Sequence, residues 1–300
     1  MSELVSERPD PVSSPDVVVL GSANLDVVFA VPSIPAPGET VLAADPAHHP
    51  GGKGLNQAVA ASRAGAVTSF LGALGDDAAA SELLAALVES GVDASEVRRV
   101  AEPSGTAWIA VDSAGENAIV VASGANAVLT ALTDAERSVI AAARVLVMQL
   151  EIPLSVVAEA VGVGRATDTV VVLNVAPAQA LDGSMLSGVD LLVVNEHEAR
   201  VLKSPMPDGL AVVTTLGARG ARWTDPDGEG SVVAPSAAVV DTTGAGDTFT
   251  GVLAAGLAAD LPLPAAIERA VVAATISVET EGAVPSIPHR DQIDRRMATG

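Results

Sequence analysis

The chain has 300 residues, of which 49% are hydrophobic and 2% aromatic, and its formal net charge is −21. That acidic balance argues against nucleic acid or an anionic membrane surface as the main partner, because both attract basic patches. The sequence contains no cysteine, which excludes disulfides and thiolate metal sites.

The first 15 residues are polar and rich in Pro and Ser. They lack the basic and apolar segments of a signal peptide, so we expect a disordered tail. No apolar run further along reaches the roughly 18 residues that a membrane-spanning helix needs. Together these features favour a soluble, cytoplasmic protein.

From residue 17 onward, short apolar runs alternate with stretches of helical length. The runs predict strands at 17–22, 145–150, 169–174, 190–195 and 210–217. The other stretches predict helices at 54–65, 76–91, 133–143, 154–161 and 264–281. Thr133 and Glu136 have the spacing of a capping box. This alternation predicts an α/β fold whose parallel sheet is covered by helices on both faces.

Two stretches interrupt the alternation. Residues 26–50 and 104–122 are rich in Pro, Gly and Val, and the second contains the run TAWIAVDSAGENAIVV. Such patterns indicate antiparallel hairpins, the second of which turns at SAGEN. We expect the two stretches to form a small second sheet beside the main one.

Several predicted strands end in polar residues. Asn24 and Asp26 lie two apart, so on a strand they share one face. The others follow three further strands: Glu151, Asn195 with Glu198 three residues later, and Thr215. Each alone is more often a turn or cap residue. Because the carboxyl ends of parallel strands meet at one edge of a sheet, their joint occurrence predicts a ligand site there.

The stretch PGGKGLNQA at 50–58 places a glycine pair before a predicted helix. It is not a Walker A loop, because Ala47 and Gly54 stand where that motif needs Gly and Ser or Thr. Adjacent glycines let a ligand approach the backbone, and Lys53 and Asn56 lie one turn apart beside it. A tight loop with a solvated lysine is the alternative interpretation.

The stretch VVDTTGAGDTFTG at 239–251 places Asp247 behind Gly244 and Gly246, where a helix is predicted to begin. Free N–H groups at a helix start bind a phosphoryl group, and a carboxylate beside them is placed to accept a hydroxyl proton. A plain helix cap is the alternative. A cap explains the acid but not the glycines, so we favour a catalytic carboxylate.

Two long segments, GGKGLNQAVAASRAGA at 51–66 and DTTGAGDTFTGVL at 241–253, resemble the two signatures of the phosphofructokinase-B-type sugar kinases. Within that family the chain resembles the ribokinases, from about residue 17 to about residue 296. The resemblance implies a three-layer ribokinase-like α/β fold, with a kinase domain at 16–296 and a β-sheet lid formed by 26–50 and 104–122. It also implies a homodimer that pairs through the lid.

The implied reaction is ATP-dependent phosphorylation of D-ribose at O5. The resemblance implies that Asp247 is the general base and that Gly244, Ala245 and Gly246 form the anion hole. Asp247 would share the sugar site with Asn24, Asp26, Gly52, Lys53, Asn56 and Glu151. Besides Gly246, the ATP-binding residues would be Asn195, Thr215, Gly217, Arg219 and Gly220.

The resemblance further implies two metal ions. Glu198 would organise Mg2+ through water and phosphate. A monovalent cation, usually K+, would be bound largely through backbone carbonyls of a loop region that includes Asp241, Thr243, Ser277, Thr280, Gly282 and Ser286. That cation would lie next to the anion hole and stabilise it.

Two features depart from the ribokinase pattern. Residues 196–210 are short and interrupted by prolines, so we expect one short helix where ribokinases have an additional one. Val271 stands where some relatives have a polar residue beside adenine, which leaves nucleotide selectivity open.

The amide and carboxylate groups of the implied sugar site favour a small free sugar, whose hydroxyls need paired donors and acceptors. A nucleoside would need stacking surface, and aromatic residues are scarce. Deoxyribose, another pentose or a ketohexose stays open as the acceptor. A non-catalytic sugar-binding sensor is an alternative of another class, which the intact Asp247 and its glycines disfavour.

Overall fold

The computed structural model describes residues 14–202 and 206–299, and among these residues eight strands form the main sheet. In spatial order they are β14 (Gly228–Val232), β13 (Ala221–Asp225), β12 (Ala211–Thr215), β11 (Leu191–Asn195), β10 (Val170–Asn174), β9 (Val145–Met148), β1 (Val17–Leu20) and β4 (Thr68–Leu71). The strands from β12 to β4 are parallel, and β13 and β14 add an antiparallel hairpin. The predicted, mainly parallel sheet is confirmed. Of the tail predicted at 1–15, residues 1–13 lie outside the described residues.

Helices cover both faces of this sheet. Successive residues of a strand point to opposite faces, so each strand contributes side chains to both helix layers. Val17 and Val19 of β1 pack with one group of helices, and Val18 and Leu20 with the other. The first group is α1 (Lys53–Arg63), α2 (Ala78–Glu89), α7 (Ala245–Ala258), α8 (Leu263–Ser277) and α10 (Arg290–Thr299). The second is α3 (Asp134–Ala142), α4 (Leu154–Arg165), α5 (Gly183–Leu186) and α6 (Glu196–Leu202). The result is the three-layer α/β architecture.

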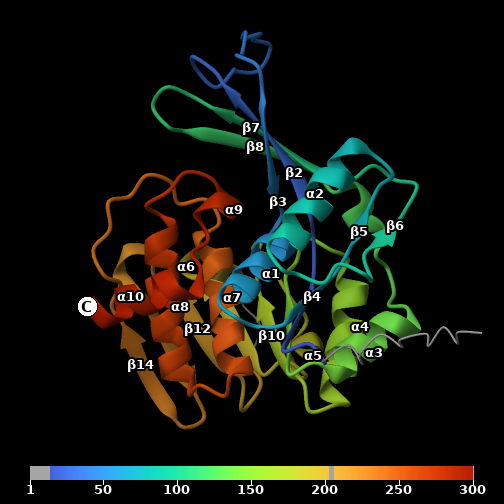
Figure 1. Cartoon of the computed structure of the whole chain (residues 1–300), viewed down its shortest axis with the longest axis vertical. Coiled ribbons are helices and arrows are strands. Elements are labelled where there is room, and N and C mark those ends of the chain that lie inside the picture. The colour runs from blue at the N-terminus through green and yellow to red at the C-terminus, as the bar shows by residue number, and fades with distance from the viewer. Residues whose placement is uncertain (1–13, 203–205, 300) are drawn as a thin grey trace, which may run out of the picture.

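A second sheet, formed entirely within the described range 14–202, has four strands. In spatial order they are β3 (Ala47–Gly51), β2 (Asn24–Ala30), β7 (Gly105–Val111) and β8 (Asn117–Ala122). It extends from the carboxyl end of β1, and Figure 1 shows it projecting beyond the main body. The small sheet predicted from the two interrupting stretches is confirmed. A separate short pair, β5 (Ala73–Leu74) and β6 (Arg98–Arg99), forms a two-stranded parallel sheet of its own.

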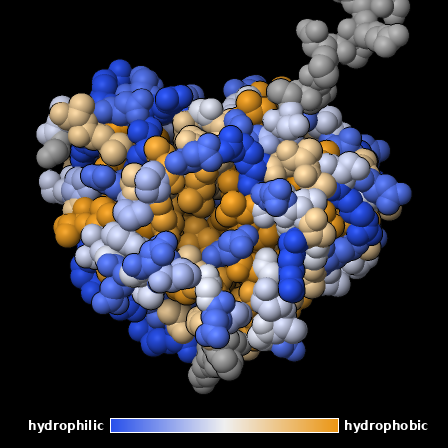
Figure 2. Space-filling view, turned by 90° about the horizontal axis from the view of Figure 1, so that it is seen from below, coloured by the Kyte–Doolittle hydropathy of each residue, from blue (hydrophilic) through white to orange (hydrophobic). Residues whose placement is uncertain are grey.

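The two ends of the main sheet differ in character. Figure 2 views the end opposite the small sheet, where apolar side chains gather in a central hollow ringed by hydrophilic ones. A cavity of about 400 Å³ adjoins Asp16 and Arg144, which precede β1 and β9. Within the two described ranges, no helix combines the length and apolar character needed to cross a membrane.

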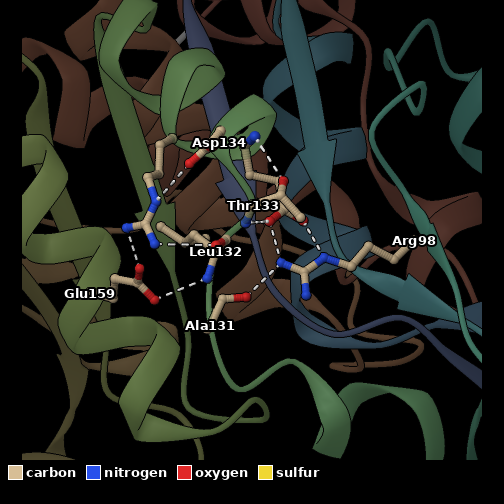
Figure 3. Close-up of polar contacts among 8 residues, drawn as sticks. Arg98, Ala131, Leu132, Thr133, Asp134 and Glu159 are labelled. Atoms are coloured by element: carbon tan, nitrogen blue, oxygen red, sulfur yellow. Dashed lines mark hydrogen bonds and ion pairs between the residues drawn. The ribbon is translucent and has the colours of Figure 1, made fainter.

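The capping box predicted at the start of α3 is present. The Thr133 hydroxyl accepts the Glu136 N–H at 3.2 Å, and Glu136 Oε2 accepts the Thr133 N–H at 2.7 Å. The buried Glu136 carboxylate also accepts Arg98 Nε at 2.7 Å. We give the name α3 brace to two of the ion pairs at this point (Figure 3), Arg98–Glu136 and Arg137–Glu159.

Between β11 and β12 the described residues contain one helix, the seven-residue α6. Residues 203–205 of this connection lie outside the described ranges. Over the part that the structure describes, the expectation of a single short helix in 196–210 agrees with the structure.

Candidate active site

Asp247 lies in the first turn of α7 at the carboxyl edge of the main sheet. Gly244 precedes the helix with a left-handed φ of 73°, and a Cβ there would lie 3.1 Å from that of Ala283. Both facts favour glycine at 244. The Asp247 side chain is 8% exposed and caps no backbone group; instead it accepts N–H bonds from another helix. The helix-cap interpretation is therefore wrong.

Gly246 differs from Gly244. It is helical, and a Cβ built on it would meet nothing within 4 Å. The fold alone does not need a glycine here, so the open space beside the helix start is available to a ligand. The first N–H groups of a helix point along its axis and carry partial positive charge, which suits an anion.

Side chains from α1 hold the Asp247 carboxylate. Asn56 Nδ2 donates to Oδ2 at 3.0 Å, and Gln57 Nε2 donates to Oδ1 at 2.9 Å. Gln57 in turn contacts Gln149 and Asn174. All of these amides are buried, so Asp247 meets a polar network rather than solvent.

The start of β2 forms the other wall of the site. Asn126, in the short helix η1 (Gly124–Val128), donates to Asn24 Oδ1 at 2.8 Å and so fixes the Asn24 amide. Gly52, with φ of 90°, lies so close that a Cβ would come 2.7 Å from the Asn24 nitrogen. A cavity of about 460 Å³ is lined by Asn24, Asn126 and Glu151 among others. Of the predicted sugar-site residues, Asn24 on β2 and Glu151 after β9 line this cavity.

Glu151 ties the segment after β9 to the start of α1. Its Oε2 accepts the Ser22 hydroxyl at 2.5 Å and the Lys53 N–H at 3.2 Å. Lys53 is half-buried, and the Asp247 carboxylate is the main cause of its raised pKa. The interpretation of Lys53 as a solvated loop residue does not fit this position.

Acidic groups outnumber basic ones at the site. We call the acids that interact with Lys53 the carboxylate cluster, which consists of Asp26, Glu151, Glu198 and Asp247. Burial, together with the charges of Glu151 and Asp247, raises the pKa of Asp26 to about 7. Burial also raises the pKa of Glu198. The site therefore keeps negative charges close together with one lysine among them.

The predicted nucleotide residues gather at the same edge, on the side of α6. Asn195 ends β11 and lies opposite Thr215, which ends β12. Asn195 Oδ1 accepts the Glu198 N–H at 2.9 Å, and Glu198 Oε2 accepts the Asn195 N–H at 2.7 Å. Arg219, in η2 (Gly217–Arg219), forms an exposed ion pair with Glu196 at 2.6 Å, and Gly220 follows directly.

The residues predicted to bind a monovalent cation lie in two adjoining loops. Asp241 accepts the N–H groups of Thr243 at 2.9 Å and Gly282 at 2.8 Å, which joins the loops. Burial raises the pKa of Asp241, but these hydrogen bonds outweigh it and hold the pKa below its usual range. The Ser277 and Ser286 hydroxyls donate to carbonyls three residues earlier in the chain, and Thr280 is exposed in the second loop.

Comparison with known proteins agrees with this arrangement. Residues 14–290 match the model of the pfkB family carbohydrate kinases. The chain belongs to the pfkB family. A ribokinase of Schizosaccharomyces pombe is 38% identical to it, over 93% of this chain and 96% of that one. A deoxyribokinase of Salmonella typhi is 32% identical, over 94% and 99%.

The fold is also similar to that of a solved ribokinase structure. The structure of Arabidopsis thaliana ribokinase complexed with ribose and ATP superimposes with a TM-score of 0.87 at 29% identity, covering 95% of this chain and 99% of that one. The resemblance and the three-layer fold expected from the sequence are thus confirmed, and the chain is a pfkB carbohydrate kinase.

Our sequence analysis missed four buried amides of this pfkB site: Gln57, Asn126, Gln149 and Asn174. Asn174 ends β10 in the way that Asn195 ends β11, so the same signal of a polar residue at a strand end was available. Gln57 lies within the first family signature. Gln149 and Asn126 carry no comparable signal, because their partners are set by tertiary contacts.

Proposed function

We propose that this pfkB kinase transfers the γ-phosphoryl group of ATP to O5 of D-ribose. The observation that carries the proposal is the placement of Asp247. Its buried carboxylate lies at the start of α7, beside open space at Gly246 and facing polar groups from β2 and α1. The Arabidopsis relative, whose structure was solved with ribose and ATP, supports the choice of substrates.

In the proposed reaction, the O5 hydroxyl gives its proton to Asp247 as the oxygen attacks the γ-phosphorus. A bond forms between O5 and phosphorus, the bond from phosphorus to the bridging oxygen breaks, and ADP leaves. The N–H groups of Gly244, Ala245 and Gly246 stabilise the charge on the migrating group. Hydroxyls of the sugar are paired by Asn24, Asp26, Gly52, Lys53, Asn56 and Glu151.

We assign ATP to the edge formed by Asn195, Thr215, Gly217, Arg219, Gly220 and Gly246. Among the described residues, no three His, Asp or Glu side chains lie close enough to enclose a metal ion. Mg2+ prefers to keep waters and to bind phosphates with one or two carboxylates, so Glu198 with ATP suits it. When bound, Mg2+ neutralises charge on the phosphates.

The 241–243 and 277–286 loops fit a monovalent cation. The groups offered are backbone carbonyls, the ionised Asp241 and the serine hydroxyl oxygens, which keep lone pairs while their protons are donated to carbonyls. Oxygen ligands of this kind suit K+, and the nearby start of α7 would be stabilised by the cation. Exchange of K+ for the much larger tetramethylammonium ion is expected to lower kcat.

We propose that the small sheet acts as a lid and pairs two copies of the chain. Register places Asp26, Ala107 and Val121 on the face toward the site, and Val27, Trp108 and Val120 on the opposite face. Trp108 and Val120 are 60% and 69% exposed there. A second copy that covers this outer face would bury them, so Trp108→Glu is expected to shift the protein to a monomer in sedimentation experiments.

A substrate panel tests the proposed function. Purified protein with ATP, Mg2+ and K+ is given D-ribose, 2-deoxyribose, fructose or adenosine, and ADP release is measured. We expect the highest kcat/KM with ribose, and phosphorus NMR to place the ester on carbon 5. A preference for deoxyribose would replace the substrate but keep the reaction. Sugar binding without turnover of any acceptor would favour the sensor.

The role of Asp247 has its own test. Asp247→Asn keeps the size of the side chain but removes the base, so kcat should fall about 10³-fold. Ribose affinity measured by calorimetry should change little. A variant with near-normal turnover would remove Asp247 from the proposed mechanism.

A further inference from the structure

Three buried amide side chains lie directly behind the Asp247 carboxylate. Gln57 comes from α1, Gln149 follows β9, and Asn174 ends β10. Gln57 and Gln149 are fully buried, and Asn174 is 7% exposed. None of the three belongs to the sugar or nucleotide residues assigned above. Buried amides destabilise a core unless their groups are paired, so this set needs a reason.

The hydrogen bonds fix the orientation of every amide that leads to Asp247. Asn174 Nδ2 donates to the Val193 carbonyl at 3.1 Å, and a carbonyl only accepts. Asn174 Oδ1 therefore faces Gln57 and accepts its Nε2 at 3.1 Å. The same Nε2 donates to Asp247 Oδ1 at 2.9 Å. The Val193 carbonyl thus fixes Asn174, and Asn174 fixes Gln57 with its N–H2 group donating to the Asp247 carboxylate.

Gln149 secures the other end of Gln57. Gln149 Nε2 donates to Gln57 Oε1 at 2.6 Å, which leaves Gln57 Nε2 no choice but to face Asp247 and Asn174. A rotation of the Gln57 amide would place its oxygen against the oxygens of Asp247 and Asn174, and its N–H2 group against that of Gln149. Gln57 is consequently locked by three partners that come from three different segments.

The two oxygens of Asp247 have different surroundings. Oδ1 is bonded to the locked Gln57, whereas Oδ2 accepts Asn56 Nδ2, a group at the expected sugar site. The other end of that amide, Asn56 Oδ1, is buried without a hydrogen-bond partner among the described residues. An unpaired acceptor on the same amide that bonds Oδ2 suits a hydroxyl that arrives with the substrate.

We propose that Gln57 is a positioning residue, which holds Asp247 by Oδ1 so that Oδ2 takes the proton of the sugar hydroxyl. The proposal rests on the role of Asp247 proposed above. General-base transfer depends on the alignment of the accepting oxygen, and small displacements of a catalytic group lower the rate strongly. Gln57 acts through Asp247 and contacts neither the sugar nor the nucleotide.

Gln57→Met tests this role, because Met has a similar length and shape but no N–H donor. We expect kcat to fall about 10- to 100-fold, while KM for ribose and for ATP stays within about threefold. Gln149→Met frees Gln57 without removing its N–H, so a smaller loss of kcat, about threefold to tenfold, is expected. A merely structural role would lower thermal stability without this split between kcat and KM.

Thr248→Val is the matched control. Thr248 is fully buried next to Asp247 in the same helix, and its hydroxyl has no hydrogen-bond partner among the described residues. The substitution perturbs the same core without touching the amide chain, so kcat should stay within about twofold. If Gln57→Met is too unstable to purify, Gln57→Asn withdraws the donor by one carbon–carbon bond and carries the same expected loss.

The outcomes separate this proposal from the one it rests on. If Asp247→Asn loses turnover while folded Gln57→Met keeps kcat within twofold, Gln57 does not position the base. The same conclusion holds if ribose KM rises in place of the kcat loss. Retained turnover in Asp247→Asn would instead overturn the assignment of the base itself.

Discussion

Charged side chains are used in opposite ways in the α3 brace and in the carboxylate cluster. In the brace each acid has an arginine, and the most buried acid, Glu136, also accepts the N–H of Thr133 (Figure 3). In the cluster, Asp26, Glu151, Glu198 and Asp247 share one Lys53. The brace joins α3 to α4 and β6, and the cluster lies where a ligand is expected.

The comparison shows where this fold tolerates carboxylates that outnumber their cations. A buried charge that is paired and hydrogen-bonded is acceptable in a folded chain, whereas like charges close together disfavour ionisation. The brace follows the first rule. In the cluster, burial and the neighbouring carboxylates Glu151 and Asp247 raise the pKa of Asp26 to about 7, as the second rule predicts. Sites that violate the rules of stable packing are commonly functional. Each of the following predictions changes one member of one region.

The largest change in stability is expected in the brace. Arg98→Met leaves the buried Glu136 carboxylate without its cation and removes a 2.6 Å hydrogen bond to the Ala131 carbonyl. Breaking one partner of a buried ion pair should lower the free energy of unfolding by about 3 kcal/mol. Urea denaturation measures this loss, while kcat and KM at 25 °C should stay within threefold.

Arg137→Met is the control for that experiment. Its partner Glu159 is 24% exposed and Arg137 itself 40%, so water replaces the lost partner and the loss should be below about 1 kcal/mol. Equal losses in the two variants would mean that burial of Glu136 does not decide the strength of the brace.

The second prediction reverses the sign. The unfolded pKa of an aspartate is near 3.9, and in the folded chain that of Asp26 is about 7. Ionisation of Asp26 therefore destabilises the folded protein increasingly as pH rises from about 4 to about 7. Asp26→Asn removes this effect, so the variant should exceed the wild type by about 2 kcal/mol in unfolding free energy at pH 8.

The gain should shrink as the pH is lowered and nearly vanish at pH 4. Ribose affinity at pH 8 should meanwhile fall at least tenfold, because the carboxylate that accepts sugar hydroxyls is lost. Denaturation curves at several pH values and calorimetry with ribose measure both effects. A variant no more stable than the wild type at pH 8 would show that the cluster is not under electrostatic strain.

Most of the fold could be predicted from the sequence because its signals are local. The Val- and Leu-rich runs of β1, β9, β10 and β11 bury both faces, as a parallel sheet between helix layers requires. The β13–β14 hairpin was not predicted. Its strands have a mixed pattern of exposure, since they lie at the edge of the sheet.

The residues of the site also divide into those that a local sequence pattern predicts and those that it does not. Asp247 and its glycines stand in one short stretch, so their relation is visible in the sequence. The partner that holds Asp247 is not, because Gln57 is 190 residues away and its amide is oriented by Gln149 and Asn174. A hydrogen bond between distant segments depends on the packing of α1 against α7, which no local pattern encodes.

The smallest effect is expected at a pair that combines features of both regions. Arg219 and Glu196 are joined as in the brace, yet they lie at the edge to which we assigned ATP, where their side chains are 65% and 48% exposed. Water screens such a pair, so we expect Arg219 to exchange Glu196 for a phosphate of ATP. Arg219→Ala should raise KM for ATP about threefold to fivefold and leave kcat and the melting temperature unchanged. Glu196→Gln, which releases Arg219, should lower KM for ATP by up to about twofold. If both variants instead shift the melting temperature and neither shifts KM for ATP, the pair is structural, as the brace is. Arg219 would then not be a ligand-binding residue.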